Sequence, residues 1–137
     1  MQGQQINSGV QCKAKRKILV LEDDEQLAEL MKNLFEMTGY SYWIIGNTNN
    51  VIPLITKFKP DLVILDYLLP GINGSEICIQ IKQNLCTHDV PVLIFSSYPG
   101  AICSIVDCGL DGFLPKPFEL KALEEIIAKL VSRTHAI

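Results

Sequence analysis

The sequence lacks any long apolar run, and this excludes one class of protein at once. No apolar stretch in its 137 residues reaches the roughly 20 residues that a membrane-spanning helix needs. The N-terminus also lacks the apolar stretch of a secretory signal. We therefore expect a cytoplasmic protein with no membrane partner.

Histidine is scarce, and the cysteines form no metal-binding pattern. The chain has two histidines and five cysteines, and it contains no Cys-x-x-Cys pair. Zinc sites combine cysteine and histidine at close spacing, whereas an odd number of scattered cysteines is typical of reduced, buried thiols. We expect neither a zinc site nor a disulfide framework.

An excess of basic residues is also absent. The chain carries 12 basic against 15 acidic residues, a net charge of −3. This balance gives no general attraction to nucleic acid, so we expect no direct nucleic-acid binding. A short basic cluster at Lys13, Lys15, Arg16 and Lys17 is interpreted as a solvated lead-in to the first strand.

The chain is long enough for one domain with a real core, because 48% of its residues are hydrophobic. Residues 1–14 are polar and aperiodic, which predicts a flexible tail. We expect a single domain over residues 15–137, with no linker or second domain after the last helix.

Short apolar runs alternate with helical patterns along that domain. Strands are predicted at residues 18–21, 42–45, 62–65, 92–95 and 112–114, and helices at 25–38, 50–57, 75–84, 100–107 and 120–130. Strands that are apolar throughout are buried on both faces, so helices must cover the sheet on each side. The predicted fold class is α/β: a doubly wound five-stranded parallel sheet, a flavodoxin-like (βα)5 sandwich.

Polar residues follow several of these strands. They are Glu22, Asp23 and Asp24 after the first strand, Asp66 at the end of the third, Ser96 and Ser97 at the end of the fourth, and Lys116 after the fifth. The carboxyl ends of parallel strands share one edge of the sheet, so these side chains should converge. Each has an ordinary explanation alone; Asp24, for example, fits a helix N-cap.

Clustered acids point to a bound cation. Two carboxylates about 4 Å apart repel by roughly 4 kcal/mol at an effective dielectric near 20. A hard ion with oxygen ligands, most plausibly Mg²⁺, relieves that repulsion. The set suits phosphoryl transfer, with Asp66 as nucleophile, Lys116 contacting the phosphoryl group and the Ser96 hydroxyl donating to it.

Four motifs carry a resemblance to a known family. ILVLEDD, LVILDYLLPGINGSE, PVLIFSS and GFLPKPFE occur in this order between Lys17 and about Ser132. Together they resemble the response-regulator receiver domains of two-component phosphorelay signalling. The resemblance implies the strand order 2-1-3-4-5 of a chemotaxis regulator of that family.

The resemblance also implies a site. Asp66 matches the phospho-acceptor, which would carry an aspartyl phosphate, in the pattern D-x-x-x-P-G-x-x-G. Glu22 and Asp23 match the acid pair that holds Mg²⁺ with Asp66, and the backbone carbonyl of Leu68 would complete the metal ligands. A register shifted to Asp23 and Asp24 is the alternative.

The remaining family positions concern the switch. Ser96 matches the switch hydroxyl, and Lys116 matches the invariant lysine, whose bond to Pro117 would be cis. Phe113 occupies the position of a switch aromatic, although a ring fixed in the core is an equal alternative. The surface of the fourth helix, fifth strand and fifth helix would carry the output.

The resemblance implies a regulatory domain rather than an enzyme, one that assists its own phosphotransfer and dephosphorylation. Its donor would be a sensor histidine kinase or a phosphotransfer protein, its output partner is open, and a homodimer is plausible. Leu68 and Tyr98 flank the site and are bulky, which predicts slow self-hydrolysis. The stretch from Ser97 to Gly109 is shorter than usual, so the fourth helix should be short or shifted.

Three other functions are compatible with parts of this sequence. A flavodoxin-like cofactor binder needs a first loop that accepts phosphate, and the acids at residues 22–24 would repel it. An aspartyl-phosphate hydrolase of the haloacid-dehalogenase type needs D-x-D, whereas Asp66 is followed by Tyr67 and Leu68. A phosphorylation-independent pseudo-receiver that only docks to a partner remains the alternative.

Overall fold

The computed structural model describes residues 15–46, 48, 50–69, 71–98 and 108–135. The elements in chain order are β1 (Lys17–Leu21), α1 (Glu25–Thr38), β2 (Ser41–Ile45), α2 (Val51–Phe58), β3 (Leu62–Asp66), β4 (Leu68–Leu69), β5 (Ile72–Asn73), α3 (Gly74–Gln83), β6 (Val92–Ser96), β7 (Gly112–Pro115), α5 (Leu120–Val131) and a 3-10 turn, η1 (Ser132–His135). Among the described residues, no helix is long and apolar enough to cross a bilayer.

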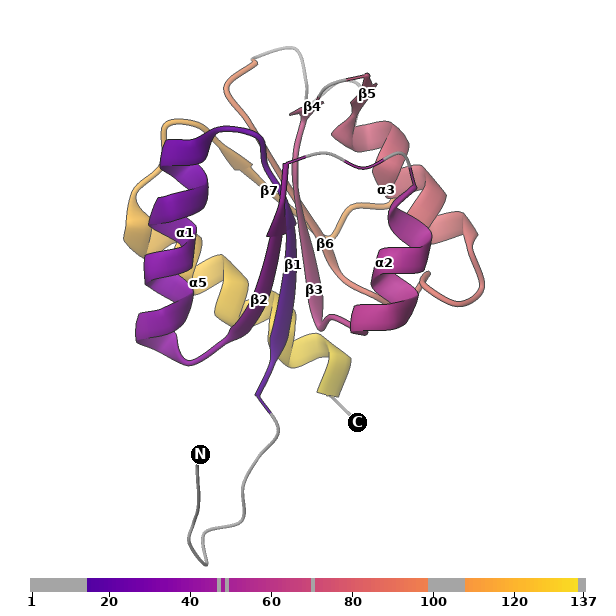
Figure 1. Ribbon diagram of the computed structural model, residues 1–137, viewed down its shortest axis with the longest axis horizontal. Helices are drawn as coiled ribbons and strands as arrows, with labels where there is room; N and C mark the ends of the chain where they lie inside the picture. Colours follow the sequence, from indigo (N-terminus) through magenta and orange to yellow (C-terminus); the bar gives the residue numbers. More distant parts are fainter. Residues whose placement is uncertain (1–14, 47, 49, 70, 99–107, 136–137) are drawn as a thin grey trace, which may run out of the picture.

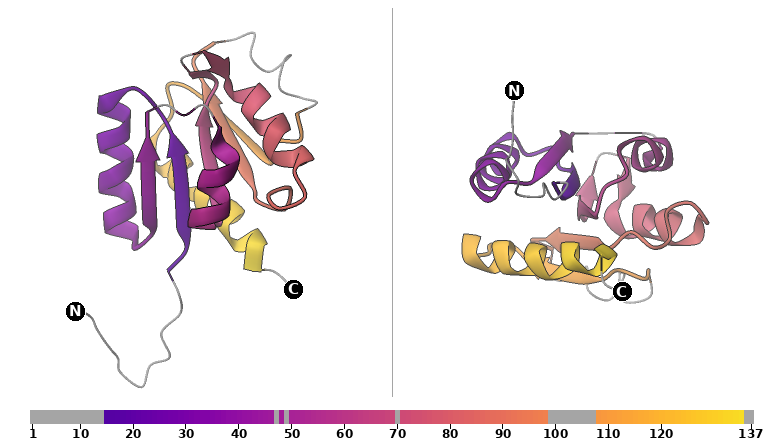
Figure 2. Two further views of the ribbon diagram at one scale, coloured as in Figure 1. Left: turned by 45° about the vertical axis from the view of Figure 1, so that its right-hand side comes forward. Right: turned by 90° about the horizontal axis from the view of Figure 1, so that it is seen from below.

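The main sheet is parallel and has the order β2-β1-β3-β6-β7. This confirms the predicted order 2-1-3-4-5, because β6 and β7 are the fourth and fifth strands of the sheet. In Figure 1 the sheet stands between two helical layers, with α1 and α5 on one face and α2 and α3 on the other. Views from other directions show the same layers (Figure 2).

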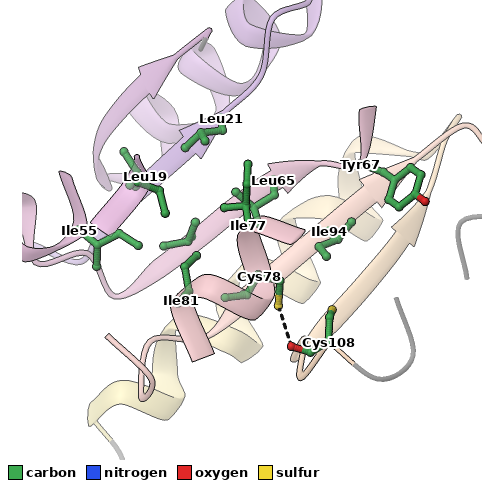
Figure 3. Packing of buried hydrophobic residues seen from close by; sticks show 13 residues of the cluster. Leu19, Leu21, Ile55, Leu65, Tyr67, Ile77, Cys78, Ile81, Ile94 and Cys108 are labelled. Atoms are coloured by element: carbon green, nitrogen blue, oxygen red, sulfur yellow. Dashed lines mark hydrogen bonds between the residues drawn. The ribbon is translucent and has the colours of Figure 1, made fainter. Parts of the chain in front are cut away.

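The two faces of the sheet bury separate hydrophobic clusters, because side chains alternate along each strand. In β1, Leu19 and Leu21 point to the layer of α2 and α3, and Ile18 and Val20 point to the layer of α1 and α5. Figure 3 shows the first cluster, in which the thiol of Cys78 lies 3.4 Å from the backbone oxygen of Cys108. Free, buried thiols are what the sequence predicts.

Helix ends follow the local sequence signals. Asp24 caps α1, and Gly39 ends it with a φ of 88°, a left-handed conformation that glycine adopts without strain. Asn50 caps α2, which places Pro53 in the first turn as the sequence requires. Among the described residues, α1 connects β1 to β2, α2 connects β2 to β3, and α3 leads to β6.

The short hairpin of β4 and β5 directly after Asp66 was not predicted. Its two-residue strands are too short for a periodic pattern to reveal. The predicted tail over residues 1–14 and the predicted helix over residues 100–107 lie outside the described residues, so both stay predictions.

Candidate functional site

Three acids meet at the carboxyl edge of the central strands. Glu22 and Asp23 directly follow β1, and Asp66 is the last residue of the neighbouring strand β3. Each offers a carboxylate oxygen, and these oxygens lie within 4.8 Å of one another. Glu22 and Asp66 are buried, whereas Asp23 is exposed. The fold thus brings together the acids that the sequence selected.

Lys116 reaches the same cluster from the end of β7. Its ammonium lies 3.4 Å from Oδ2 of Asp66 and 3.6 Å from Oε1 of Glu22. The ammonium also lies over the ring of Phe95, 4.9 Å from the centroid. The peptide bond from Lys116 to Pro117 is cis, as the resemblance implies. Within the described part of the chain, Lys116 is thus the cation that pairs with the two buried carboxylates, Glu22 and Asp66.

The charge of Glu22 is poorly satisfied in this arrangement. Its Oε2 accepts the backbone N–H of Asp24 at 2.9 Å, but its buried Oε1 has no hydrogen-bond partner among the described residues. Burial raises the pKa of Glu22 to about 7, and the nearby charge of Asp66 adds to the rise. A further cation would satisfy this orphaned oxygen, and an all-oxygen donor set fits Mg²⁺.

Asp24 is committed elsewhere. Its Oδ1 accepts the backbone N–H groups of Gln26 at 2.9 Å and Leu27 at 3.4 Å, which caps α1. The geometry therefore favours Glu22 and Asp23 as the acid pair over the alternative register of Asp23 and Asp24.

Ser96 lies at the end of β6, next to β3 in the sheet. Its Oγ accepts the backbone N–H of Tyr98 at 2.9 Å, which leaves the hydroxyl hydrogen free to be donated to another group. Its backbone oxygen accepts the N–H of Lys116 at 2.8 Å. Ser96 is buried, so the hydroxyl is held in place beside the acids rather than moving freely in solvent.

Phe113 lies within β7, and Leu68 lies in β4, two residues after Asp66. Phe113 is partly buried and packs against the cluster between the sheet and the layer of α2 and α3. The side chain of Leu68 is 58% exposed, next to the acid cluster in the chain. The role of Phe113 as a switch aromatic stays a prediction. The role of the Leu68 carbonyl as a metal ligand also stays a prediction.

Two features of the site escaped sequence analysis. A Cβ at Gly74 would lie 2.8 Å from the backbone oxygen of Asp66, so only glycine permits this approach of α3 to β3. The ring of Tyr67 stacks on the ring of Tyr98, with centroids 6.1 Å apart. Gly74 is the last residue of the pattern D-x-x-x-P-G-x-x-G, but the pattern does not give its contact with Asp66. The stack of Tyr67 on Tyr98 joins segments distant in the chain.

The comparison with protein families agrees with this geometry. The model of the response regulator receiver domain matches residues 18–128. The chain belongs to this family. A curated relative of this receiver domain, the response regulator MprA of Mycolicibacterium vanbaalenii, is 32% identical over 116 residues, which cover 83% of this chain and 48% of the relative. The chain thus spans about half the length of the curated relatives it matches.

Solved structures show the same fold. A putative response regulator from Chloroflexus aurantiacus superposes with a TM-score of 0.80 and 26% identity, covering 87% of this chain and 99% of that one. The receiver domain of the sensor histidine kinase PA1611 from Pseudomonas aeruginosa has a TM-score of 0.78 over 87% of this chain and 99% of its own. At 19% identity, this second likeness concerns the fold alone. Receiver domains of response regulators are regulatory domains that act in phosphorylation-based signalling.

Proposed function

We propose that this receiver domain accepts a phosphoryl group on Asp66 in a magnesium-dependent reaction and passes the signal to an output partner. The observation that carries the proposal is the position of Lys116. Its ammonium bridges Asp66 and Glu22 at 3.4 and 3.6 Å, where it can also bind a phosphoryl oxygen on Asp66. A charge-bearing lysine is costly to bring to a half-buried position unless anions surround it.

The proposed donor is the phosphohistidine of a sensor histidine kinase or a phosphotransfer protein. An Asp66 oxygen forms a bond to phosphorus while the phosphorus–nitrogen bond breaks, and the leaving imidazole keeps the electron pair. Lys116 stabilises the charge on the phosphoryl oxygens. Buried Ser96 donates its free hydroxyl hydrogen to one of them.

Glu22, Asp23 and Asp66 would hold Mg²⁺, with the Leu68 carbonyl as a further ligand. When bound, the ion neutralises charge on the incoming phosphoryl group. The orphaned Oε1 of Glu22 supports this assignment, because it lacks a donor among the described residues. The magnesium ion coordinated in the active-site cleft of the PA1611 receiver domain is consistent with it.

A groove beside the site suits a protein donor. It holds about 490 Å³, and its lining includes Leu27, Leu30, Pro117 and Phe118, with Lys116 among its polar residues. Leu30 is 41% exposed, so it offers apolar surface to a partner. An apolar helix of the donor laid in this groove would bring its phosphohistidine close to Asp66.

The output step is proposed to run through Ser96 and Phe113. Once Asp66 is phosphorylated, movement of Ser96 toward the phosphoryl group would break its bond from Tyr98 and free space for the Phe113 ring. Phe113 lies in β7, which neighbours β6 in the sheet. The surface that would change comprises β7, α5 and the predicted helix over residues 100–107.

A pseudo-receiver that docks without phosphorylation is the second candidate. It would need neither Lys116 nor the two buried acids, Glu22 and Asp66. Burying these charges would lower its stability without serving a function. The complete set of Glu22, Asp23, Asp66, Ser96 and Lys116 at one edge therefore favours the phospho-acceptor.

Labelling with a small phosphodonor separates the two candidates. We expect acid-stable, base-labile incorporation that requires Mg²⁺ and is lost in Asp66→Ala. Asp24→Asn is the matched control, because it removes an adjacent carboxylate and keeps the helix cap. Labelling that persists in Asp66→Ala, or none in the wild type with Mg²⁺, contradicts the proposal.

A further inference from the structure

The edge of the sheet at β2 is unusually open. β2 pairs with β1 over all five of its residues, and no strand of the described chain lies on its other side. Natural edge strands are commonly protected by a charged residue, a proline or a bulge. The sequence of β2, SYWII, contains none of these and is rich in residues that favour strands.

The hydrogen bonds to β1 identify the backbone groups that face outward. The N–H of Ser41 donates to Arg16, and the carbonyl of Ile45 accepts from Glu22. Backbone groups alternate in direction along a strand, so Ser41, Trp43 and Ile45 face β1. Tyr42 and Ile44 therefore direct their N–H and C=O groups to the free edge.

A groove of about 600 Å³ runs beside this edge, between β2 and one stripe of α1. The stripe consists of Glu25, Ala28, Glu29 and Lys32, spaced as neighbours on one helix face, and Tyr42, Trp43 and Ile44 form the rest of the lining. The three charged residues of the stripe are exposed, and Ala28 is half-buried. An acid thus lies at one end of the stripe, a base at the other and a small residue near its centre.

We propose that a second copy of this chain pairs with β2, strand against strand in antiparallel register, about a two-fold axis at Trp43. Tyr42 then lies opposite Ile44 of the other copy, and each residue presents its outward N–H and C=O to the other. Both side chains face the layer of α1, so each contact is an aromatic pair with a β-branched residue, a favourable cross-strand combination.

The charges on α1 select this partner. The same two-fold axis places the two α1 helices antiparallel on one side of the joined sheets. Glu25 of one copy then faces Lys32 of the other, and this pair occurs twice by symmetry. Glu29 faces Ala28, and the small Ala28 lets the helices approach. The two copies of Glu29 lie on either side of the axis and form one like-charged pair, but both side chains are exposed to solvent, which screens their repulsion. The surface is complementary to itself, as a symmetric dimer requires.

A charge-swap series tests this dimer. Sedimentation of the full chain over micromolar to submillimolar concentration should show reversible dimerisation, with weak affinity because the contact is small. Lys32→Glu and Glu25→Lys should each weaken the dimer at least about tenfold, since each opposes like charges twice. The double variant carrying both changes should recover most of the affinity.

Two further measurements locate the contact. Amide exchange of Tyr42 and Ile44 should slow as concentration rises in the wild type and not in Lys32→Glu. Lys121→Glu on α5 is the matched control, because it reverses one exposed lysine on a different helix. Circular dichroism verifies that each variant is folded. A monomer at every concentration, a dimer that Lys121→Glu breaks, or a double variant no better than the singles overturns the proposal.

Discussion

Replacing Asp66 with asparagine should stabilise the metal-free domain. Asparagine keeps the size of the side chain but removes the charge that Glu22 and Asp23 repel. In most proteins, replacing a buried carboxylate that is paired with a lysine lowers stability. Here we expect stability to increase instead, and this result follows only if the three acids are clustered as the structure places them.

The magnitude follows from the distances. The carboxylate oxygens lie no more than 4.8 Å apart. At that separation a pair of carboxylates repels by roughly 3.5 kcal/mol at an effective dielectric of about 20, and Asp66 faces two such carboxylates. The ammonium of Lys116 lies 3.4 Å from the Asp66 carboxylate and attracts it by about 5 kcal/mol at the same effective dielectric. Repulsion exceeds attraction by about 2 kcal/mol, and solvent around exposed Asp23 reduces that margin. We expect a gain of roughly 1–2 kcal/mol, a rise in Tm of about 4–8 °C.

The assay is thermal unfolding followed by circular dichroism in EDTA, at a pH about one unit above the pKa of Glu22 so that the Glu22 carboxylate is charged. Asp24→Asn should change Tm far less, because asparagine is an equally good cap. Excess MgCl₂ should raise the Tm of the wild type more than the Tm of Asp66→Asn. The difference in Tm between the two proteins should therefore shrink. An unchanged or lower Tm of Asp66→Asn in EDTA would refute the clustering of the acids.

Three further predictions follow from the same edge of the sheet. The pKa of Glu22 is raised from 4.5 to about 7. Between these pH values the metal-free native state therefore binds more protons than the unfolded chain, so Tm should rise as pH falls from 7 toward 4.5. Excess Mg²⁺ should abolish this rise in Tm. Gly74→Ala forces a Cβ to 2.8 Å from the Asp66 oxygen and should cost about 2 kcal/mol or more in urea unfolding, whereas a loss under 0.5 kcal/mol would contradict that close approach. Phosphorylated protein should lose its label slowly, because bulky Leu68 and Tyr98 position water poorly for hydrolysis. Leu68→Asn should speed the loss of label severalfold. Wild-type decay as fast as that of the quickest chemotaxis-type regulators would disprove slow self-hydrolysis.

Much of the site could be predicted from sequence because the parallel sheet imposes its own geometry. Once residues 18–21 and 62–65 are assigned as neighbouring buried strands, the acids that follow them must share an edge. The same reasoning places Ser96 and Lys116 there. The cap at Asp24 was also predictable, since capping depends on residues within one turn.

Other features could not be predicted because they depend on contacts between distant segments. The raised pKa of Glu22 requires knowing that its carboxylate is buried beside Asp66, and the sequence does not distinguish buried Glu22 from exposed Asp23. The stack of Tyr67 on Tyr98 is another such contact. The motif that contains Gly74 is visible in the sequence, but its close approach to the Asp66 backbone is not.

The sequence by itself determined the order of strands and helices and the edge at which the polar residues gather, because these depend on periodicity and on the direction of parallel strands. Only the tertiary structure decided which acids face each other, that one oxygen of Glu22 is left without a donor and that the backbone groups of Tyr42 and Ile44 face outward. Hydrogen bonding and desolvation depend on distances of a few ångströms between segments far apart in the chain. Those distances exist only after the sheet has formed.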